Sequence, residues 1–182
     1  MKYSFYHVFF VLSVIICSCS NPKQNSNSAT NAAQSATKQS IDTADTRLAN
    51  DLSIFCTSQI KAGQLAATKA STQKVKEFGK QTAELYTTLS SRLNAISENY
   101  DITLPAASPI ATERLQKLTA IKGASFDHEY LLQMLKQHNA MIREYNAAKN
   151  IQCVPLRMYV GSNQADIIKQ AYATSDLKDK TP

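Results

Sequence analysis

Apolar side chains recur at heptad spacing between Gly123 and Asn150, which predicts an amphipathic helix of about seven turns. Its hydrophobic face consists of Leu131, Met134, His138, Met141, Tyr145 and Ala148, widened by Phe126, Leu135 and Ile142. His138 is the one polar side chain in this face. Whether it binds a metal or only makes hydrogen bonds in the core is the main chemical question that the sequence raises.

The same periodicity predicts three further long helices and one short helix. The long helices cover about 46–69, 73–100 and 155–175, and the short helix covers about 110–121. A connection of roughly twenty residues separates the second and third long helices, whereas a plain up-down bundle needs only a short loop there. We therefore expect an all-α, ferritin-like four-helix bundle with a short extra helix in the crossover between helices two and three.

Polar residues, glycine and proline mark the ends of these helices. Ser71 or Thr72 can cap the second long helix and Ser125 the third, because their side-chain oxygens accept bonds from free N–H groups. Gly123 is expected to close the short helix. Pro155 falls in the first turn of the fourth long helix, where its missing N–H has no cost.

The N-terminus has the pattern of an export signal that ends in a lipidated cysteine. Lys2 precedes an apolar run from Phe5 to Ile16, which is too short to cross a membrane and has the length of a secretory signal. The sequence around Cys19, with Ile16 at minus three and Ser18 at minus one, resembles the lipobox of bacterial lipoproteins. An ordinary secretory signal is the alternative. By the usual sorting rule, Ser20 after the cysteine indicates the outer membrane.

Four segments follow from this organisation. We expect a signal peptide over 1–18, a lipidated Cys19 with a flexible tether over 19–44, a helical domain over 45–178 and a disordered tail over 179–182. The tether is rich in Asn, Ser, Gln, Thr and Ala without apolar periodicity, so it cannot bury enough surface to order itself. At its end, Asp42-Thr43-Ala44 resembles a short O-glycosylation sequon of exported Bacteroidetes proteins, with Thr43 as the acceptor.

Charge and composition exclude several classes of function. The formal net charge is +6, but the Lys and Arg residues are scattered along the helices and form no stripe with aromatic side chains. Nucleic-acid binding therefore gains no support. The chain also lacks a Gly-rich phosphate-binding loop and a Cys-x-x-Cys metal motif, and we expect no cofactor.

Two stretches resemble an uncharacterised bacterial family. The first runs from Ala62 to Ser71 and continues as Val75-Lys76-Glu77-Phe78-Gly79; the second begins Phe126-Asp127-His128-Glu129-Tyr130 and extends to His138. Together with Leu104-Pro105, these stretches resemble the domain of unknown function 4142 family over about residues 47–174. The resemblance implies an exported, ferritin-like bundle and no established activity.

The same resemblance raises the question of a metal site. Members of the family typically carry glutamates and Asp-His pairs inside the bundle, as a transition-metal site requires. The matching positions here are Gln59 and Lys61, Leu85 and Tyr86, Gln137 and His138, and about Ile167. Only His138 is retained, which makes it the weak alternative as a metal ligand. The preferred hypothesis is a neutral polar core layer formed by Gln59, Tyr86, His138 and Asn163.

The two cysteines and the second histidine of the mature chain limit the possible disulfide and the possible catalytic residues. Cys56 and Cys153 can form a disulfide, as exported cysteine pairs often do, or can be two separately buried thiols. A Cys-His nucleophile is disfavoured because the sequence shows no orienting acid and no oxyanion-hole loop. His128, ten residues from His138, is expected to be a solvated surface residue.

These observations favour a non-enzymatic protein. The preferred hypothesis is a lipid-anchored periplasmic bundle on the outer membrane that acts as an envelope interaction or stress-related module, held in the membrane by the lipid on Cys19 and bound to an envelope protein partner. The alternative is a ferritin-like metal-binding or redox domain with a degenerate site around His138. A small-molecule carrier would need a cavity between the helices.

Overall fold

The computed structural model describes residues 41–148 and 150–181. In this part the chain forms five helices, α1 (Thr43–Lys69), α2 (Gln73–Tyr100), α3 (Pro109–Ala120), α4 (Ala124–Ala147) and α5 (Val154–Asp179), and no strand. The predicted signal peptide, Cys19 and the tether up to residue 40 lie outside the described residues. No helix in the described ranges has the length and apolar character needed to cross a membrane.

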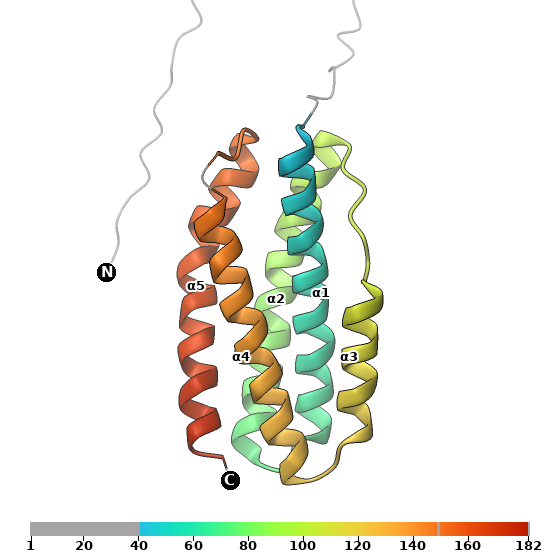
Figure 1. The fold of residues 1–182 in the computed structure, drawn as a ribbon, viewed down its shortest axis with the longest axis vertical. Helices are drawn as coiled ribbons and strands as arrows, with labels where there is room; N and C mark the ends of the chain where they lie inside the picture. The colour runs from blue at the N-terminus through green and yellow to red at the C-terminus, as the bar shows by residue number, and fades with distance from the viewer. Residues whose placement is uncertain (1–40, 149, 182) are drawn as a thin grey trace, which may run out of the picture. The chain divides into compact units, whose positions relative to one another are not determined.

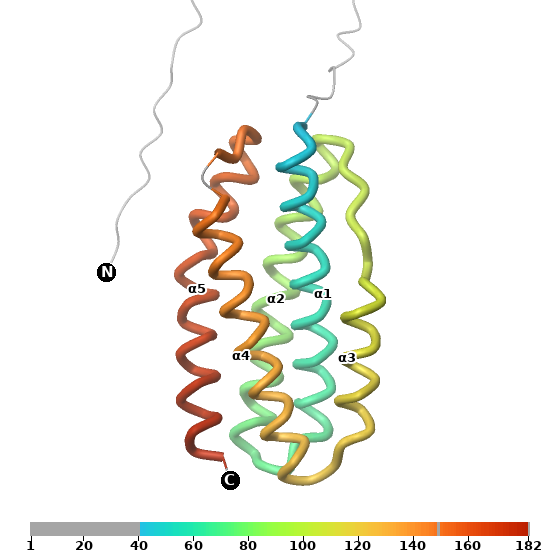
Figure 2. The backbone as a smooth tube through the Cα atoms, viewed as in Figure 1, coloured from blue at the N-terminus to red at the C-terminus, as the bar shows by residue number. Residues whose placement is uncertain are grey.

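The four long helices form one bundle, in which α1 packs against α2 and α4, and α5 packs against the same two helices. Figure 1 shows α1 and α5 running in one direction and α2 and α4 in the other. The chain therefore returns along the bundle between α2 and α4, and α3 lies in this crossover against α1 and α4 (Figure 2). This confirms the predicted all-α bundle with an extra helix in the crossover, and the helix order is that of ferritin-like bundles.

Three helix starts follow from local capping. The carboxylate of Asp42 accepts a hydrogen bond from the N–H of Asp45 at 2.7 Å, so α1 begins at Thr43, before the expected residue 46. Thr72 caps α2 through the N–H of Val75, as one of the two expected caps. Ser108 caps α3, whose first residue is Pro109.

The expected caps around Gly123 were wrong. Helix α3 ends at Ala120 because Ile121 has an extended backbone, and Gly123 is the residue before α4, with a φ of 62°. This left-handed φ favours glycine, so its place is the turn between the two helices. Ser125 lies inside α4 and makes no capping bond.

The ends of the last two helices also differ from the expected ones. Helix α4 stops at Ala147, before the expected Asn150. Helix α5 extends to Asp179, beyond the expected fraying at Ser175. Thr174 is buried, and Leu177 packs against the core that surrounds the start of α4. Burial of this last turn stabilises it beyond what its polar sequence indicates.

The core has two hydrophobic clusters, one towards each end of the bundle. The first includes Leu52, Leu93 and Leu156, and the second includes Phe126 and Leu131. Figure 1 places the first cluster's helix segments near the starts of α1 and α5, and the second near the α1–α2 turn. Buried Gln59, Thr82 and His138 lie between the two clusters along α1, α2 and α4.

Two glycines bring α1 and α2 into close contact. A Cβ atom built on Gly63 would lie 2.6 Å from the carbonyl oxygen of Gly79, and one built on Gly79 would lie 2.7 Å from that of Gly63. Real Cβ atoms do not approach a backbone oxygen so closely, hence only glycine fits at these positions. Both residues belong to the stretch that carries the family resemblance.

Candidate functional site

The polar side chains expected in the core all lie inside the bundle. Gln59 of α1, Tyr86 of α2, His138 of α4 and Asn163 of α5 are each fully buried. His138 and Tyr86 are directly joined, with 2.8 Å between the imidazole Nε2 and the phenol oxygen. The ring of Phe55 packs edge-on against both of them. The pair therefore sits in an aromatic, dry part of the core.

The other two expected residues bond elsewhere. The amide nitrogen of Gln59 donates to Gln137 of α4 at 3.2 Å. The amide oxygen of Asn163 accepts from the guanidinium of Arg92 at 2.9 Å. The four residues thus form three separate pairs that link α1 to α4, α2 to α4 and α2 to α5. The sequence analysis did not identify Gln137 and Arg92 as hydrogen-bond partners. Both lie at the edge of the core, and their side chains do not belong to the apolar pattern that marks buried positions.

His138 is held neutral at physiological pH. Burial lowers the pKa of His138 to about 4, against the opposing influence of the backbone of Met134. Burial likewise raises the pKa of Tyr86 well above its ordinary value. A neutral imidazole and a neutral phenol share one hydrogen bond here. Proton exchange with solvent would require the bundle to open.

The surroundings of His138 do not fit an iron or manganese centre. Such centres use several carboxylates together with imidazoles. Among the described residues, no group of three or more His, Cys, Asp or Glu side chains lies close enough to hold a metal ion. The side chains next to His138 supply a phenol and an aromatic ring.

Of the two alternatives for Cys56 and Cys153, the structure shows two separately buried thiols and no disulfide between them. The N–H of Cys153 bonds to the carboxylate of Asp45 at 2.6 Å, which fixes Cys153 at the start of α1. Cys56 lies eleven residues further along that helix, or about 16 Å at the helical rise. A disulfide requires Cα atoms within about 7 Å. Starting at the same end of the bundle therefore does not bring the two thiols together.

The thiol of Cys56 is also unreactive. Its sulfur faces the hydroxyl of Tyr159 at 3.8 Å, and burial raises the pKa of Cys56 to about 11. A thiol of this kind is almost fully protonated at neutral pH and is a poor nucleophile. No imidazole is bonded to it, since the imidazole of His138 is paired with Tyr86.

Two buried carboxylates act at opposite ends of the bundle, and the sequence analysis did not identify them. Asp45 joins the start of α1 to the start of α5. Asp127 accepts bonds from the N–H and hydroxyl of Ser71 and from the N–H of Thr72, at 2.7 to 2.9 Å. Burial alone raises the pKa of Asp127, but these donors together lower it below the ordinary value. Both carboxylates hold helix ends in place, and Asp45 also borders an open hollow between the start of α1 and the end of α4.

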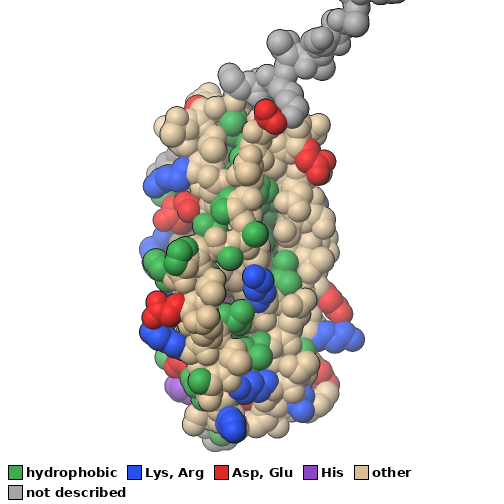
Figure 3. Space-filling model, turned by 90° about the vertical axis from the view of Figure 1, so that its right-hand side faces the viewer, with side chains coloured by type: hydrophobic (Ala, Val, Ile, Leu, Met, Phe, Trp, Pro, Cys, Tyr) green, Lys and Arg blue, Asp and Glu red, His purple; other side chains and the backbone are tan. Residues whose placement is uncertain are grey.

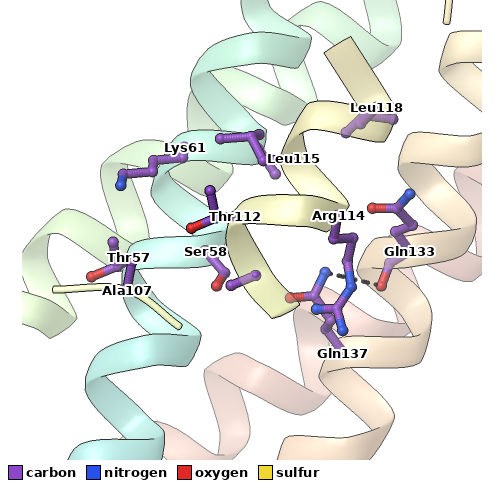
Figure 4. A pocket seen from close by; sticks show the side chains of 12 residues that line it. Thr57, Ser58, Lys61, Ala107, Thr112, Arg114, Leu115, Leu118, Gln133 and Gln137 are labelled. Carbon is purple, nitrogen blue, oxygen red and sulfur yellow. Dashed lines mark hydrogen bonds between the residues drawn. The ribbon is translucent and has the colours of Figure 1, made fainter. Parts of the chain in front are cut away.

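A small cleft lies between α1, α3 and α4 (Figure 4). Its volume is about 70 Å³, and its walls combine Leu115 and Leu118 with the polar groups of Lys61, Arg114 and Gln137. The space suits a few waters or one small ion. Its lining contains no carboxylate, thiol or imidazole, so it supplies no acid-base pair for a reaction.

The remaining surface on this side is mixed in charge. Figure 3 shows Lys and Arg side chains mostly on the lower half of the face that carries α3, Asp and Glu mainly towards its edges, and apolar side chains in a broken line along its middle. His128 is exposed near the start of α4, away from the buried His138. This mixed surface agrees with the scattered positive charge of the sequence.

An all-α bundle with a crossover helix and hydrogen-bonded polar pairs in its core is thus the class that the fold and the core define. The family model Domain of unknown function (DUF4142) matches residues 28–170, and the chain belongs to this family. Neither the curated proteins nor the solved structures give a match. The resemblance found in the sequence is confirmed.

Proposed function

We propose that this protein is a non-enzymatic, lipid-anchored envelope protein that works by binding another protein through the outer side of α5. The observation that carries the proposal is an apolar surface on a helix whose opposite side already forms the core. Val154, Met158 and Tyr172 are 50%, 68% and 75% exposed, although each is large and hydrophobic.

The exposed side chains lie on one line. At about 100° per residue, Val154 and Tyr172 have the same direction from the axis of α5, and Met158 lies about 40° from it. Helix α5 contacts α2 and α4, and it lies at the left edge of the bundle in Figure 1. A surface helix normally has polar residues on its outer side. A continuous apolar surface is characteristic of an interaction site.

The core supports a binding role over a catalytic one. The neutral pairs around His138 and the two carboxylates at the helix ends are bonded within the bundle. These hydrogen bonds give the bonded atoms a stabilising role in the bundle. A protein of this design would act through its surface.

Membrane attachment is the second part of the proposal. The lipobox-like sequence at Cys19 supports acylation, and Ser20 supports sorting to the outer membrane. The bundle would then face the periplasm at the end of a polar tether. Substitution Cys19→Ala tests this part: we expect the protein to move from the membrane fraction to the soluble fraction and to lose incorporation of labelled palmitate. Unchanged fractionation and labelling would refute the anchor.

Binding through α5 is tested by photo-cross-linking in cells. A photo-reactive amino acid replaces Met158 on the outer side of α5, and the control is the same replacement at Ala95, an exposed residue of α2. We expect discrete cross-linked products from position 158 and only background from position 95. Equal background at both positions would exclude α5 as the binding side.

A further inference from the structure

The apolar residues on the outer side of α5 are arranged symmetrically along the helix. We call this set the α5 stripe; it consists of Val154, Met158, Gly161, Ala165, Ile168 and Tyr172. Its members stand in pairs nine, five and two residues on either side of Asn163. At 100° per residue, all of them lie within about 40° of one line, opposite the buried Asn163.

A set of apolar positions that is symmetric about one point is suited to pair with a second copy of itself in the antiparallel direction. We propose that the partner of the α5 stripe is a second copy of this chain, packed antiparallel about a two-fold axis level with Asn163. The inference rests on the proposed binding through α5 and adds the identity of the partner. A two-fold interface uses one patch of surface on both subunits, so that patch must be self-complementary.

The antiparallel register pairs side chains of suitable size. At each end Val154 meets Tyr172 of the other copy, and between end and centre Met158 meets Ile168. In the parallel register, each residue would instead meet its own copy, and the two Tyr172 rings would compete for one place. The antiparallel arrangement therefore fills the contact more evenly.

The centre of the stripe permits close approach of two helices. Gly161 and Ala165 flank the proposed axis, and a Cβ atom built on Gly161 meets nothing within 4 Å. Small residues at a crossing let helix axes approach to about 8 Å. The exposed cations Arg157 and Lys169 lie about 60° to opposite sides of the stripe. In the antiparallel pair they stand on opposite edges of the contact, so the pairing does not bring them directly together.

The contact area predicts a weak dimer. The stripe runs over nineteen residues, or about 27 Å from first to last, and a helix is about 10 Å wide. Such a contact buries on the order of 500 Å² per copy, close to the lower limit for a specific interface. A shallow apolar groove beside the C-terminal half, formed by Leu135, Ile142 and Ala171, extends the surface. Attachment of both copies to one membrane would favour the pair by raising their effective concentration.

The first experiment measures association by sedimentation equilibrium. It uses residues 37–182, because they form one compact unit. We expect a reversible monomer–dimer equilibrium at protein concentrations up to about 500 µM, with a dissociation constant of roughly 10–100 µM. Ala165→Glu brings two carboxylates together at the axis and should raise that constant at least about tenfold. Ala173→Glu is the matched control: the same exchange on the same helix, at an exposed site about 100° from the stripe, should change it less than about twofold.

The second experiment tests the orientation through disulfide formation. Val154→Cys and Tyr172→Cys are oxidised separately and as a mixture, and the wild-type chain, whose two thiols are buried, serves as the control. In the antiparallel pair, a covalent dimer forms only in the mixture. Covalent dimers within either separate sample would indicate a parallel pair and overturn the proposal, as would the absence of any covalent dimer.

The outcomes separate this inference from the proposed function. A protein that stays monomeric at about 500 µM, or a dimer that Ala165→Glu leaves intact, overturns self-association through the α5 stripe. If the photo-reactive group at position 158 then captures a different protein, binding through α5 still holds. If it captures nothing, both proposals fail. Capture of a second copy in cells, lost in Ala165→Glu, supports both.

Discussion

The contact between Gly63 and Gly79 makes a sharp prediction, because helix propensity and packing act in opposite directions. Alanine favours a helix interior over glycine by about 0.8–1 kcal/mol. At Gly79, however, the new methyl group would lie 2.7 Å from the oxygen of Gly63 and 2.8 Å from the Cβ of Ala66. Both are well inside ordinary contact. We therefore expect Gly79→Ala to destabilise the bundle.

The magnitude follows from the displacement that the methyl group requires. Restoring an ordinary contact of about 3.4 Å means moving α1 and α2 apart by several tenths of an ångström along their closest approach. Overpacking of this kind costs about 1–3 kcal/mol, and occasionally more. After subtraction of the gain in propensity, the free energy of unfolding should fall by up to about 2 kcal/mol. Urea unfolding followed by circular dichroism measures the change.

Gly161 supplies the matched control. It lies inside α5, and an added Cβ meets nothing within 4 Å. Gly161→Ala should raise the free energy of unfolding by up to about 1 kcal/mol when measured at low protein concentration, where the monomer dominates. We therefore expect the free energy of unfolding to fall for Gly79→Ala and to rise for Gly161→Ala. If Gly79→Ala raised the free energy of unfolding as much as Gly161→Ala does, the close approach of α1 and α2 would be refuted.

Three further predictions concern the buried polar groups. Asp127→Asn should lower the free energy of unfolding by about 1–3 kcal/mol at neutral pH. Because the pKa of Asp127 is lowered in the fold, the difference between variant and wild type should persist above about pH 4 and shrink as the pH falls through the folded pKa. A difference in the free energy of unfolding that does not depend on pH would contradict the carboxylate's role. Because the folded pKa of His138 is about 4 against an ordinary 6.5, the wild type should lose stability as the pH falls from 6.5 to 4. His138→Gln should lose less stability over the same pH range. Parallel curves of unfolding free energy against pH for the two proteins would contradict burial of a neutral imidazole. Cys56 and Cys153 should resist a thiol reagent in the native protein and both react after denaturation in the absence of reductant, whereas a lack of reactive thiols after denaturation would indicate the disulfide.

The helices were predictable because their periodicity is strong over many turns. The range Gln73–Tyr100 was obtained in full, since Thr72 caps one end and the sequence after Tyr100 is rich in proline. The turn at Gly123 was misassigned because a glycine with positive φ serves equally after one helix or before the next. Only the backbone of Ile121 decides between the two.

The interior chemistry was less accessible from sequence. Heptad spacing places Gln59, His138 and Asn163 inside, but it does not give the rotation of each helix, and this rotation determines which polar groups pair. Arg92 and Gln137 approach the core from its edge, so no pattern marks them as partners. The disulfide failed for a different reason: helix order gave the correct end of the bundle, but the distance along α1 separates the two thiols.

The residues that carry the family resemblance have structural roles in this bundle. Gly63 and Gly79 permit the contact between α1 and α2, and Asp127 holds the turn between them against the start of α4. Such residues determine how the helices pack and contain no information about a binding partner. The α5 stripe begins after the second of those stretches ends, and its last member, Tyr172, lies beyond the matched residues 28–170. The proposed binding is therefore tested on the surface of α5 itself, and the paired cysteine variants at Val154 and Tyr172 address that surface directly.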